Sequence, residues 1–282
     1  MTTLTTAGAA ATLALMPPAA APAHGGEVAD ALRFQTRLLW RREREVLLPL
    51  VAEAAGECPS VLDVCCGTGE FLSRLTDELP GAELFGADHN APGLSHAARL
   101  LGDRARLLEC DATSLPYEDG RFDVVTCRHA LQTMPKGIAE AVVSEMVRVC
   151  RPGGLVYLTN EDVGSCRGSL RPGAIEAGMR VFCGLWASHG MDIRLGLRQD
   201  RLLRSCGLET QVAPIVARSQ DGVEDWEGMV QSWADIHEQM AFESGMSEEE
   251  TGTLLEGLEL YRRCAREGRA EWPVWACWAL KA

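Results

Sequence analysis

The sequence predicts an α/β fold in which helices flank a mostly parallel β-sheet. The first observation is a series of short apolar segments of strand length, at residues 61–64, 84–87, 106–109, 122–127 and 155–160. The second is that intervening segments, such as residues 70–79, repeat apolar residues at helical spacing. The third is that several strands end in an acidic or polar residue. Strands alternating with helices are typical of a parallel sheet, which binds its ligand at the carboxyl edge.

The first predicted strand, residues 61–64, has an acidic residue within its apolar run and leads into a glycine turn. Gly67 and Gly69 bound this turn, and a helix is predicted directly after it. A strand, a glycine turn and a helix start form a nucleotide-binding corner, because the backbone can approach the ligand and helix amides point towards it. A dehydrogenase fits less well, since Leu72 replaces the third glycine of the G-x-G-x-x-G pattern.

The ends of the later strands carry the next candidate residues. Asp88 follows the second strand, about twenty residues beyond the glycines, where a carboxylate can hold two ribose hydroxyls. Asp111 follows the third strand, where a side chain could meet an adenine amino group. Arg128 and His129 end the fourth strand. All these side chains are therefore expected at one edge of the sheet.

In order and spacing, the segments VLDVCCGTG, GADHN, CDA, FDVVTC and CRPGGL resemble the motifs of the class I S-adenosylmethionine-dependent methyltransferases, over roughly residues 61–160. The first segment looks most like the small-molecule branch that includes the ubiquinone and menaquinone methylases. One departure is Cys65, which replaces the first glycine of the loop at a position where that branch tolerates a small residue. The resemblance implies a Rossmann-like sheet of seven strands, the last of them antiparallel, with a helical lid.

The resemblance also implies S-adenosylmethionine as cofactor and S-adenosylhomocysteine as product. The cofactor contacts that it implies are Asp63, Cys65, Gly67, Thr68, Gly69, Asp88, His89, Asp111, Ala112 and Arg128. In related enzymes a leading helix often closes over the cofactor, so Arg42 or Trp40 could reach the methionine carboxylate. A solvated charged helix face is the favoured interpretation of Arg42.

His129 is the catalytic candidate, because a neutral imidazole near pH 7 can take a proton from a hydroxyl, an amine or an acidic carbon. Many relatives place a histidine slightly later, where this chain has Gln132 and Thr133. A purely structural role for His129 therefore stays open. His189 and His237 are the competing histidines, although a lone histidine on a helix is more often structural.

The residues expected to contact the acceptor are Gln132, Asn160, Glu161 and Trp186. Glu161 could bind a cationic group of the acceptor or point to solvent. Trp186 could wall a flat apolar acceptor together with Trp226 and Trp233, but tryptophans at helical spacing more often pack in the core.

The composition of this chain of 282 residues indicates which classes of substrate and ligand it can bind. The formal charge of −13 repels phosphate backbones, so a small molecule is a better substrate than a nucleic acid. Eleven cysteines without a C-x-x-C pair predict core thiols in a reducing cytoplasm rather than disulfides or a metal site. No stretch reaches the roughly 18 apolar residues of a membrane span. A homodimer stays open.

The domain organisation follows from composition and periodicity. Composition predicts a disordered leader at residues 1–26 and a single methyltransferase domain at residues 27–282. Pro49 is expected to kink or divide the N-terminal helix. The parts of the domain are the N-terminal helix (27–58), the cofactor-binding core (59–165), a helical cover (166–206 and 221–269) and the final strands (208–219 and 272–280).

The predicted function is transfer of a methyl group from S-adenosylmethionine to oxygen, nitrogen or carbon of a small acceptor, in specialised metabolism. A first alternative keeps the fold but catalyses a cyclisation or an elimination. A second alternative is a module that binds the cofactor without catalysis.

Overall fold

The computed structural model describes residues 25–282. The leader predicted at residues 1–26 lies outside the described residues, apart from its last two, which begin helix α2 (Gly25–Ala55). Pro49 lies inside α2 without dividing it. Among residues 25–282, no helix combines the length and the apolar composition that crossing a membrane requires.

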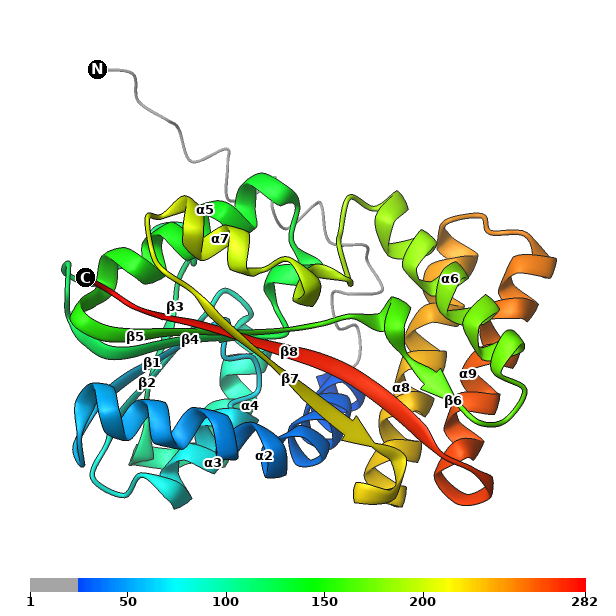
Figure 1. Cartoon of the computed structure of the whole chain (residues 1–282), viewed down its shortest axis with the longest axis horizontal. Coiled ribbons are helices and arrows are strands. Elements are labelled where there is room, and N and C mark those ends of the chain that lie inside the picture. Colours follow the sequence, from blue (N-terminus) through cyan, green and yellow to red (C-terminus); the bar gives the residue numbers. More distant parts are fainter. Residues whose placement is uncertain (1–24) are drawn as a thin grey trace.

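A mixed β-sheet runs through the centre of the molecule (Figure 1). Strands β1 to β5 are parallel in the order β3-β2-β1-β4-β5, and β8 then pairs antiparallel with both β5 and β7. This is the predicted α/β architecture with an antiparallel last strand. The strands are β1 (Ser60–Val64), β2 (Glu83–Asp88), β3 (Arg106–Glu109), β4 (Phe122–Arg128), β5 (Cys150–Glu161), β6 (Arg167–Gly168), β7 (Gln211–Arg218) and β8 (Ala270–Leu280).

The sheet has eight strands, one more than the seven predicted. The extra strand, β6, has two residues and pairs with the beginning of β8. Glu271 of β8 pairs with β6 and with β7, so these two strands lie on opposite edges of β8. Since β5 also lies opposite β7, β6 resumes the line of β5 after a short interruption at residues 162–166.

Helices cover both faces of the sheet and gather at one end of it (Figure 1). Helices α2, α3 and α4 lie on one face, α5 and α7 lie on the other, and α6, α8 and α9 form the end where the helical cover was predicted. The predicted cover segment 221–269 contains two helices, α8 and α9, and Ser247 starts the second of them with a capping box. The helices are α3 (Glu70–Glu78), α4 (Ala91–Leu101), α5 (Lys136–Val149), α6 (Pro172–Ser188), α7 (Asp200–Ser205), α8 (Val223–Glu243) and α9 (Glu248–Glu267).

Helix α2 joins the cofactor-binding core to the helical cover. A Cβ atom placed on Gly67 would lie 3.4 Å from the side chain of Leu32, so α2 passes directly over the glycine turn. Further along the same helix, the Phe34 ring lies so close to Gly228 of α8 that a Cβ there would come within 2.5 Å of it. A single helix therefore touches both regions.

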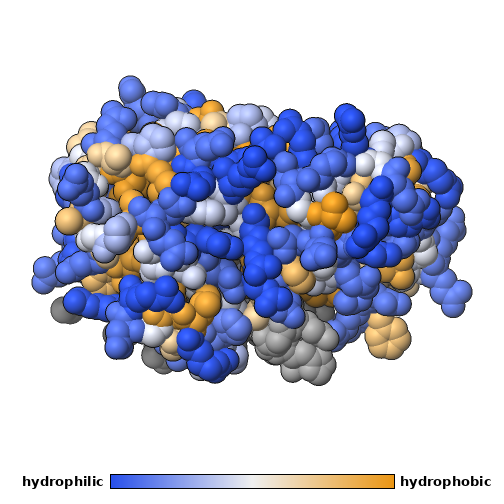
Figure 2. All heavy atoms as spheres, turned by 90° about the horizontal axis from the view of Figure 1, so that it is seen from below, coloured by the Kyte–Doolittle hydropathy of each residue, from blue (hydrophilic) through white to orange (hydrophobic). Residues whose placement is uncertain are grey.

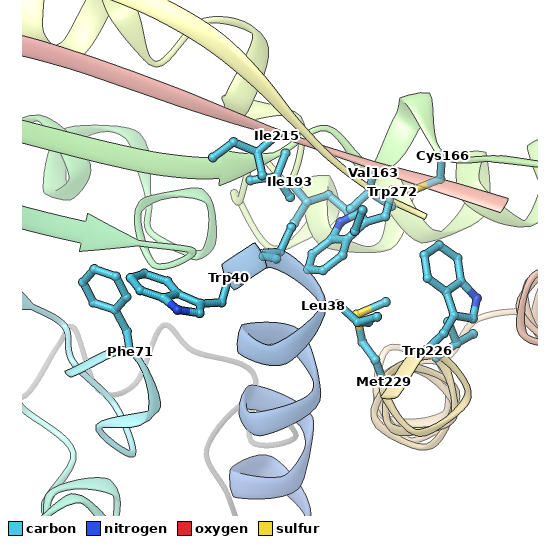
Figure 3. Packing of buried hydrophobic residues seen from close by; sticks show 14 of the residues in the cluster. Leu38, Trp40, Phe71, Val163, Cys166, Ile193, Ile215, Trp226, Met229 and Trp272 are labelled. Atoms are coloured by element: carbon cyan, nitrogen blue, oxygen red, sulfur yellow. The ribbon is translucent and has the colours of Figure 1, made fainter. Parts of the chain in front are cut away.

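The apolar core forms two clusters, and the larger one continues from the sheet into the helical cover. Figure 3 shows Val163 and Trp272 on the strand side of this cluster, facing Leu38 of α2 and Met229 of α8. Burial of these apolar side chains holds the cover to the sheet. On the face drawn in Figure 2, hydrophilic residues dominate and apolar residues form small separate areas.

Candidate active site

The turn after β1 has the left-handed backbone that glycine favours. Gly67 has φ 54° and Gly69 has φ 78°. A Cβ on Gly69 would also lie 2.9 Å from the Cβ of Ala97, so no side chain fits there. Cys65 adopts φ 61° although it is not glycine, which costs about 1–2 kcal/mol for a residue with a side chain.

Asp88, at the end of β2, braces this turn. Its Oδ2 accepts a hydrogen bond from the Gly67 amide at 2.8 Å, and its Oδ1 accepts one from the Asn90 amide at 2.8 Å. A carboxylate offers about four acceptor positions, so capacity remains for a diol such as a ribose. The Nδ1 of His89 lies 3.6 Å from Oδ1. In the turn itself, the buried hydroxyl of Thr68 has no partner among the described residues, so this site offers unused polar capacity for a nucleoside cofactor.

Asp111 and Ala112 follow β3 at the same edge of the sheet. Asp88 pairs in register with Glu109, so Asp111 lies only two residues beyond that pair. Its Oδ1 accepts hydrogen bonds from the backbone amide of Thr113 at 2.8 Å and from its hydroxyl at 2.7 Å. This turn holds Asp111 beside the second strand, where the adenine contact was predicted.

Asp63 and Arg128 are buried side by side with groups that sequence reasoning did not assign. Thr126 donates to Asp63 Oδ1 at 2.7 Å, and burial raises the pKa of Asp63 to about 7. The Arg128 guanidinium donates from Nε to Glu43 Oε1 at 2.7 Å, and its Nη2 donates to the other oxygen. It also lies 4.2 Å from the centre of the Phe71 ring, a cation–π contact. Arg128 therefore already has a carboxylate partner.

The signal for Glu43 was present in the helical periodicity. Leu39 and Leu47 lie four residues before and after it, and all three side chains are buried. An acid on the apolar face of a helix needs a buried partner, which Arg128 supplies. The two alternatives on α2 have partners within the protein: Arg42 donates to Asp221 at 3.2 Å, and Trp40 packs edge-on against Phe71. Their contact with a cofactor carboxylate stays a prediction.

His129 lies at the end of β4, next to the cofactor turn. Its backbone has φ 55°, and its amide donates to the Thr159 carbonyl at 2.8 Å. Its imidazole is buried with the Nδ1 3.3 Å from Glu161 Oε1, and its ring centre lies 5.9 Å from that of Trp272. Neither ring nitrogen makes an aligned hydrogen bond within the described part of the chain. Buried polar atoms are rarely left without partners, so the two ring nitrogens of His129 have hydrogen-bonding capacity that the described part of the chain does not use.

The comparisons with known proteins agree with this geometry. Residues 61–154, from β1 to the beginning of β5, match a family model described as a methyltransferase domain. This segment contains the glycine turn, Asp88, Asp111 and His129. This part of the chain is therefore similar to a methyltransferase domain.

Relatives and solved structures delimit the similarity. The chain is 37% identical over 126 residues to demethylmenaquinone methyltransferase of Thermus thermophilus, and this alignment covers 44% of this chain and 54% of that protein. The chain thus spans about half the length of this curated relative. YcgJ from Bacillus subtilis has a TM-score of 0.53 at 19% identity, covering 85% of this chain and 98% of that chain. The [4+2]-cyclase SpnF has a TM-score of 0.52 at 21% identity, covering 86% and 83%. Both structures show the same fold.

Gln132 and Asn160 belong to a buried amide network. Gln132 Oε1 accepts from the Glu161 amide at 2.6 Å, and Asn160 Oδ1 accepts from the Gln132 amide at 3.2 Å. Asn160 Nδ2 donates to Gln199 Oε1 at 2.8 Å, and Gln199 Nε2 donates to the Trp275 carbonyl at 2.6 Å. These amides tie β5 to the segments after β4 and before α7, and to β8. Their predicted contact with an acceptor stays a prediction, and the network role, including Gln199, was missed.

Trp186 lies within the helical cover rather than beside His129. Its Nε1 donates to His237 Nε2 at 2.6 Å, and His237 Nδ1 lies 2.6 Å from the Trp233 carbonyl. Phe182 stacks on the imidazole with ring centres 3.8 Å apart. Burial lowers the pKa of His237 to about 4, so it is neutral at pH 7. Trp186 and His237 form a structural pair, and their contact with an acceptor also stays a prediction.

Proposed function

We propose that this chain transfers a methyl group from S-adenosylmethionine to a small-molecule acceptor. The observation that carries the proposal is the placement of His129 beside the cofactor turn. Strands β1 and β4 are neighbours, with Val64 paired to Cys127 in register. The turn that begins at Cys65 and the imidazole of His129 therefore leave the sheet at adjacent strand ends.

The proposed roles follow from chemistry and placement. Asp88 accepts the ribose hydroxyls, and the buried Thr68 hydroxyl and the backbone of Gly67 and Gly69 line the turn. The bound cofactor supplies a methyl group that its sulfonium already activates. The protein then has to align the acceptor with the methyl group and exclude water. Alignment can lower the activation barrier by about 7–11 kcal/mol at most. His129 takes the proton that the acceptor loses.

The acceptor is proposed as a small molecule of specialised metabolism. The Thermus thermophilus relative is named a demethylmenaquinone methyltransferase, but the shared 126 residues account for 44% of this chain. The family match itself ends at residue 154, before the helical cover, so the similarity supports the cofactor half of the proposal more than a particular acceptor. Methylation of oxygen, nitrogen or carbon is compatible with His129 as the proton acceptor.

Product mass tests the proposal. The full chain is incubated with S-adenosylmethionine carrying a deuterated methyl group and a panel of phenols, amines and demethylated quinols. The expected result is S-adenosylhomocysteine together with a product heavier by one labelled methyl group, and loss of product in His129→Asn with cofactor binding retained. A product of unchanged mass would instead indicate the cyclisation alternative, and cofactor binding without product across the panel would contradict methyl transfer.

A further inference from the structure

The candidate base His129 lies beside Glu161, and Glu161 in turn accepts a hydrogen bond from Gln35. His129 comes from the end of β4, Glu161 from the end of β5, and Gln35 from helix α2. We propose that Glu161 is a positioning residue that holds the proton of His129 on Nδ1 and leaves Nε2 to receive a proton, and that Gln35 locks Glu161 in place. The catalytic meaning of this arrangement rests on the proposed function, whereas the arrangement itself can be measured without it.

The hydrogen-bond chemistry of Glu161 sets the tautomer. Its Oε1 accepts from Gln35 Nε2 at 2.8 Å and lies 3.3 Å from His129 Nδ1. An ionised carboxylate only accepts hydrogen bonds, so the nitrogen that faces it is favoured as N–H. A neutral imidazole has one N–H, so Nε2 is then an acceptor. The Nδ1 contact is close without being aligned, as is common for catalytic hydrogen bonds before a substrate is bound.

The main chain gives Glu161 little freedom to point elsewhere. Its amide donates to Gln132 Oε1 at 2.6 Å, and the residue pairs with Val274 of β8. The next residue, Asp162, is turned to another partner, since its Oδ1 accepts from Arg194 Nε at 2.9 Å. Consecutive residues at the end of a strand point in opposite directions, which separates these two carboxylates.

The backbone of His129 is also held in an unusual conformation. Its φ of 55° lies in the left-handed region, which a non-glycine residue adopts only where its surroundings enforce it. Here the amide hydrogen bond to the Thr159 carbonyl and the neighbouring Trp272 ring fix both the main chain and the imidazole. The end of β4, the Trp272 ring and the Glu161 carboxylate thus fix the orientation of the imidazole. A base held in one orientation is suited to take a proton from one defined position.

These contacts also define the class of acceptor. Glu161 directs its Oε1 to Gln35 and to the imidazole of His129, so the proposal gives this carboxylate the task of orienting the base rather than of binding the acceptor. Trp272, whose ring centre lies 5.9 Å from that of His129, belongs to an apolar cluster that also contains Val163 and Leu38 (Figure 3). The fitting acceptor is largely apolar and uncharged, with a proton on its nucleophilic atom, as in a phenol or an enol.

The proton and electron pairs balance in this scheme. The nucleophilic atom of the acceptor forms a bond to the methyl carbon, the bond from that carbon to sulfur breaks, and its electron pair remains on sulfur. The proton released by the acceptor moves to Nε2 of His129. The resulting imidazolium keeps its Nδ1 proton against the Glu161 carboxylate, which stabilises the positive charge.

Nitrogen NMR of the full chain measures the tautomer directly. The protein is labelled with ¹⁵N-histidine and studied at pH 8, where an ordinary histidine is neutral, with and without S-adenosylhomocysteine. The His129 signals are assigned by their absence from His129→Gln. We expect His129 to show a single tautomer with the proton on Nδ1. Glu161→Leu should lose this preference, and Gln35→Leu should give averaged signals between the two tautomers.

One variant serves as a control, and two results would overturn the inference. Glu145→Leu makes the same chemical change at a carboxylate of α5 that is bound by Arg148, and it should leave the His129 signals unchanged. A wild-type proton on Nε2, or a Glu161→Leu spectrum identical to wild type, would overturn the inference. If Glu161→Leu does not fold, the Gln35→Leu spectrum decides. Cofactor titration of the same samples tests the proposed function separately, because failure to bind would sink that proposal and leave the tautomer result standing.

Discussion

Replacing Glu43 should destabilise the protein strongly, because it leaves the buried Arg128 guanidinium without its counter-charge. The Glu43 side chain is 1% exposed and that of Arg128 is 7% exposed. Breaking a buried pair by removing one partner costs about 3–5 kcal/mol. For a domain of this size each kcal/mol lowers the melting temperature by about 2–4 °C, so Glu43→Gln should lower it by roughly 6–20 °C.

Urea unfolding of a double-mutant cycle checks this magnitude. Arg128→Met alone should also be costly, because it strands the Glu43 carboxylate. The double variant Glu43→Gln with Arg128→Met should lie closer to wild type than the sum of the two single effects predicts. Glu227→Gln is the matched control, since it breaks the solvent-exposed pair with Arg266 and should cost under about 1 kcal/mol. Equal costs for Glu43→Gln and Glu227→Gln, or additive effects in the cycle, would refute the reasoning.

Three further substitutions have measurable outcomes. Between pH 4 and 7 the folded protein keeps a proton on Asp63 that the unfolded chain has released. The stability of wild type relative to Asp63→Asn should therefore fall as the pH rises through this window, by at most about 1.4 kcal/mol per pH unit. His237 acts in the opposite direction: between pH 6.5 and 4 the unfolded chain binds its proton and the folded chain does not, so wild type should lose stability relative to His237→Phe as pH falls. Urea unfolding across pH, one variant at a time, separates the two slopes, and parallel curves would contradict either assignment. Gly69→Ala should weaken both folding and cofactor binding, because its φ is 78° and the added Cβ meets Ala97 at 2.9 Å; unfolding and binding curves equal to wild type would contradict the need for glycine.

The cofactor half of the site could be predicted from sequence because its contacts are local. The turn between Gly67 and Gly69, the carboxylate of Asp88 and the end of each parallel strand follow from short motifs and strand periodicity. Parallel strands bring their carboxyl ends to one edge, so motifs that are distant in the chain become neighbours without any further information. The structure places these residues together as predicted, and their contacts with the cofactor stay predictions.

The long-range contacts of the candidate site could not be predicted, because they join segments far apart in sequence. Gln35 and Glu161 are 126 residues apart, and Glu43 and Arg128 are 85 residues apart. No motif encodes such pairs; they depend on where α2 crosses the sheet. Trp186 has the helical spacing of a core residue, and that spacing does not distinguish a cover residue from an acceptor contact. The short strand β6 was missed because two residues carry no periodicity.

Calorimetric titration with S-adenosylmethionine is the measurement that tests the central claim most directly. Wild type should bind at micromolar concentration, and Asp88→Ala should bind about tenfold more weakly or worse, because each hydrogen bond to a charged group contributes about 1.5–3 kcal/mol. Asp103→Ala, an exposed carboxylate after α4, is the matched control and should bind like wild type. Absence of binding to wild type, or equal binding by folded Asp88→Ala, would contradict the assignment of the turn after β1 and of Asp88 to the cofactor.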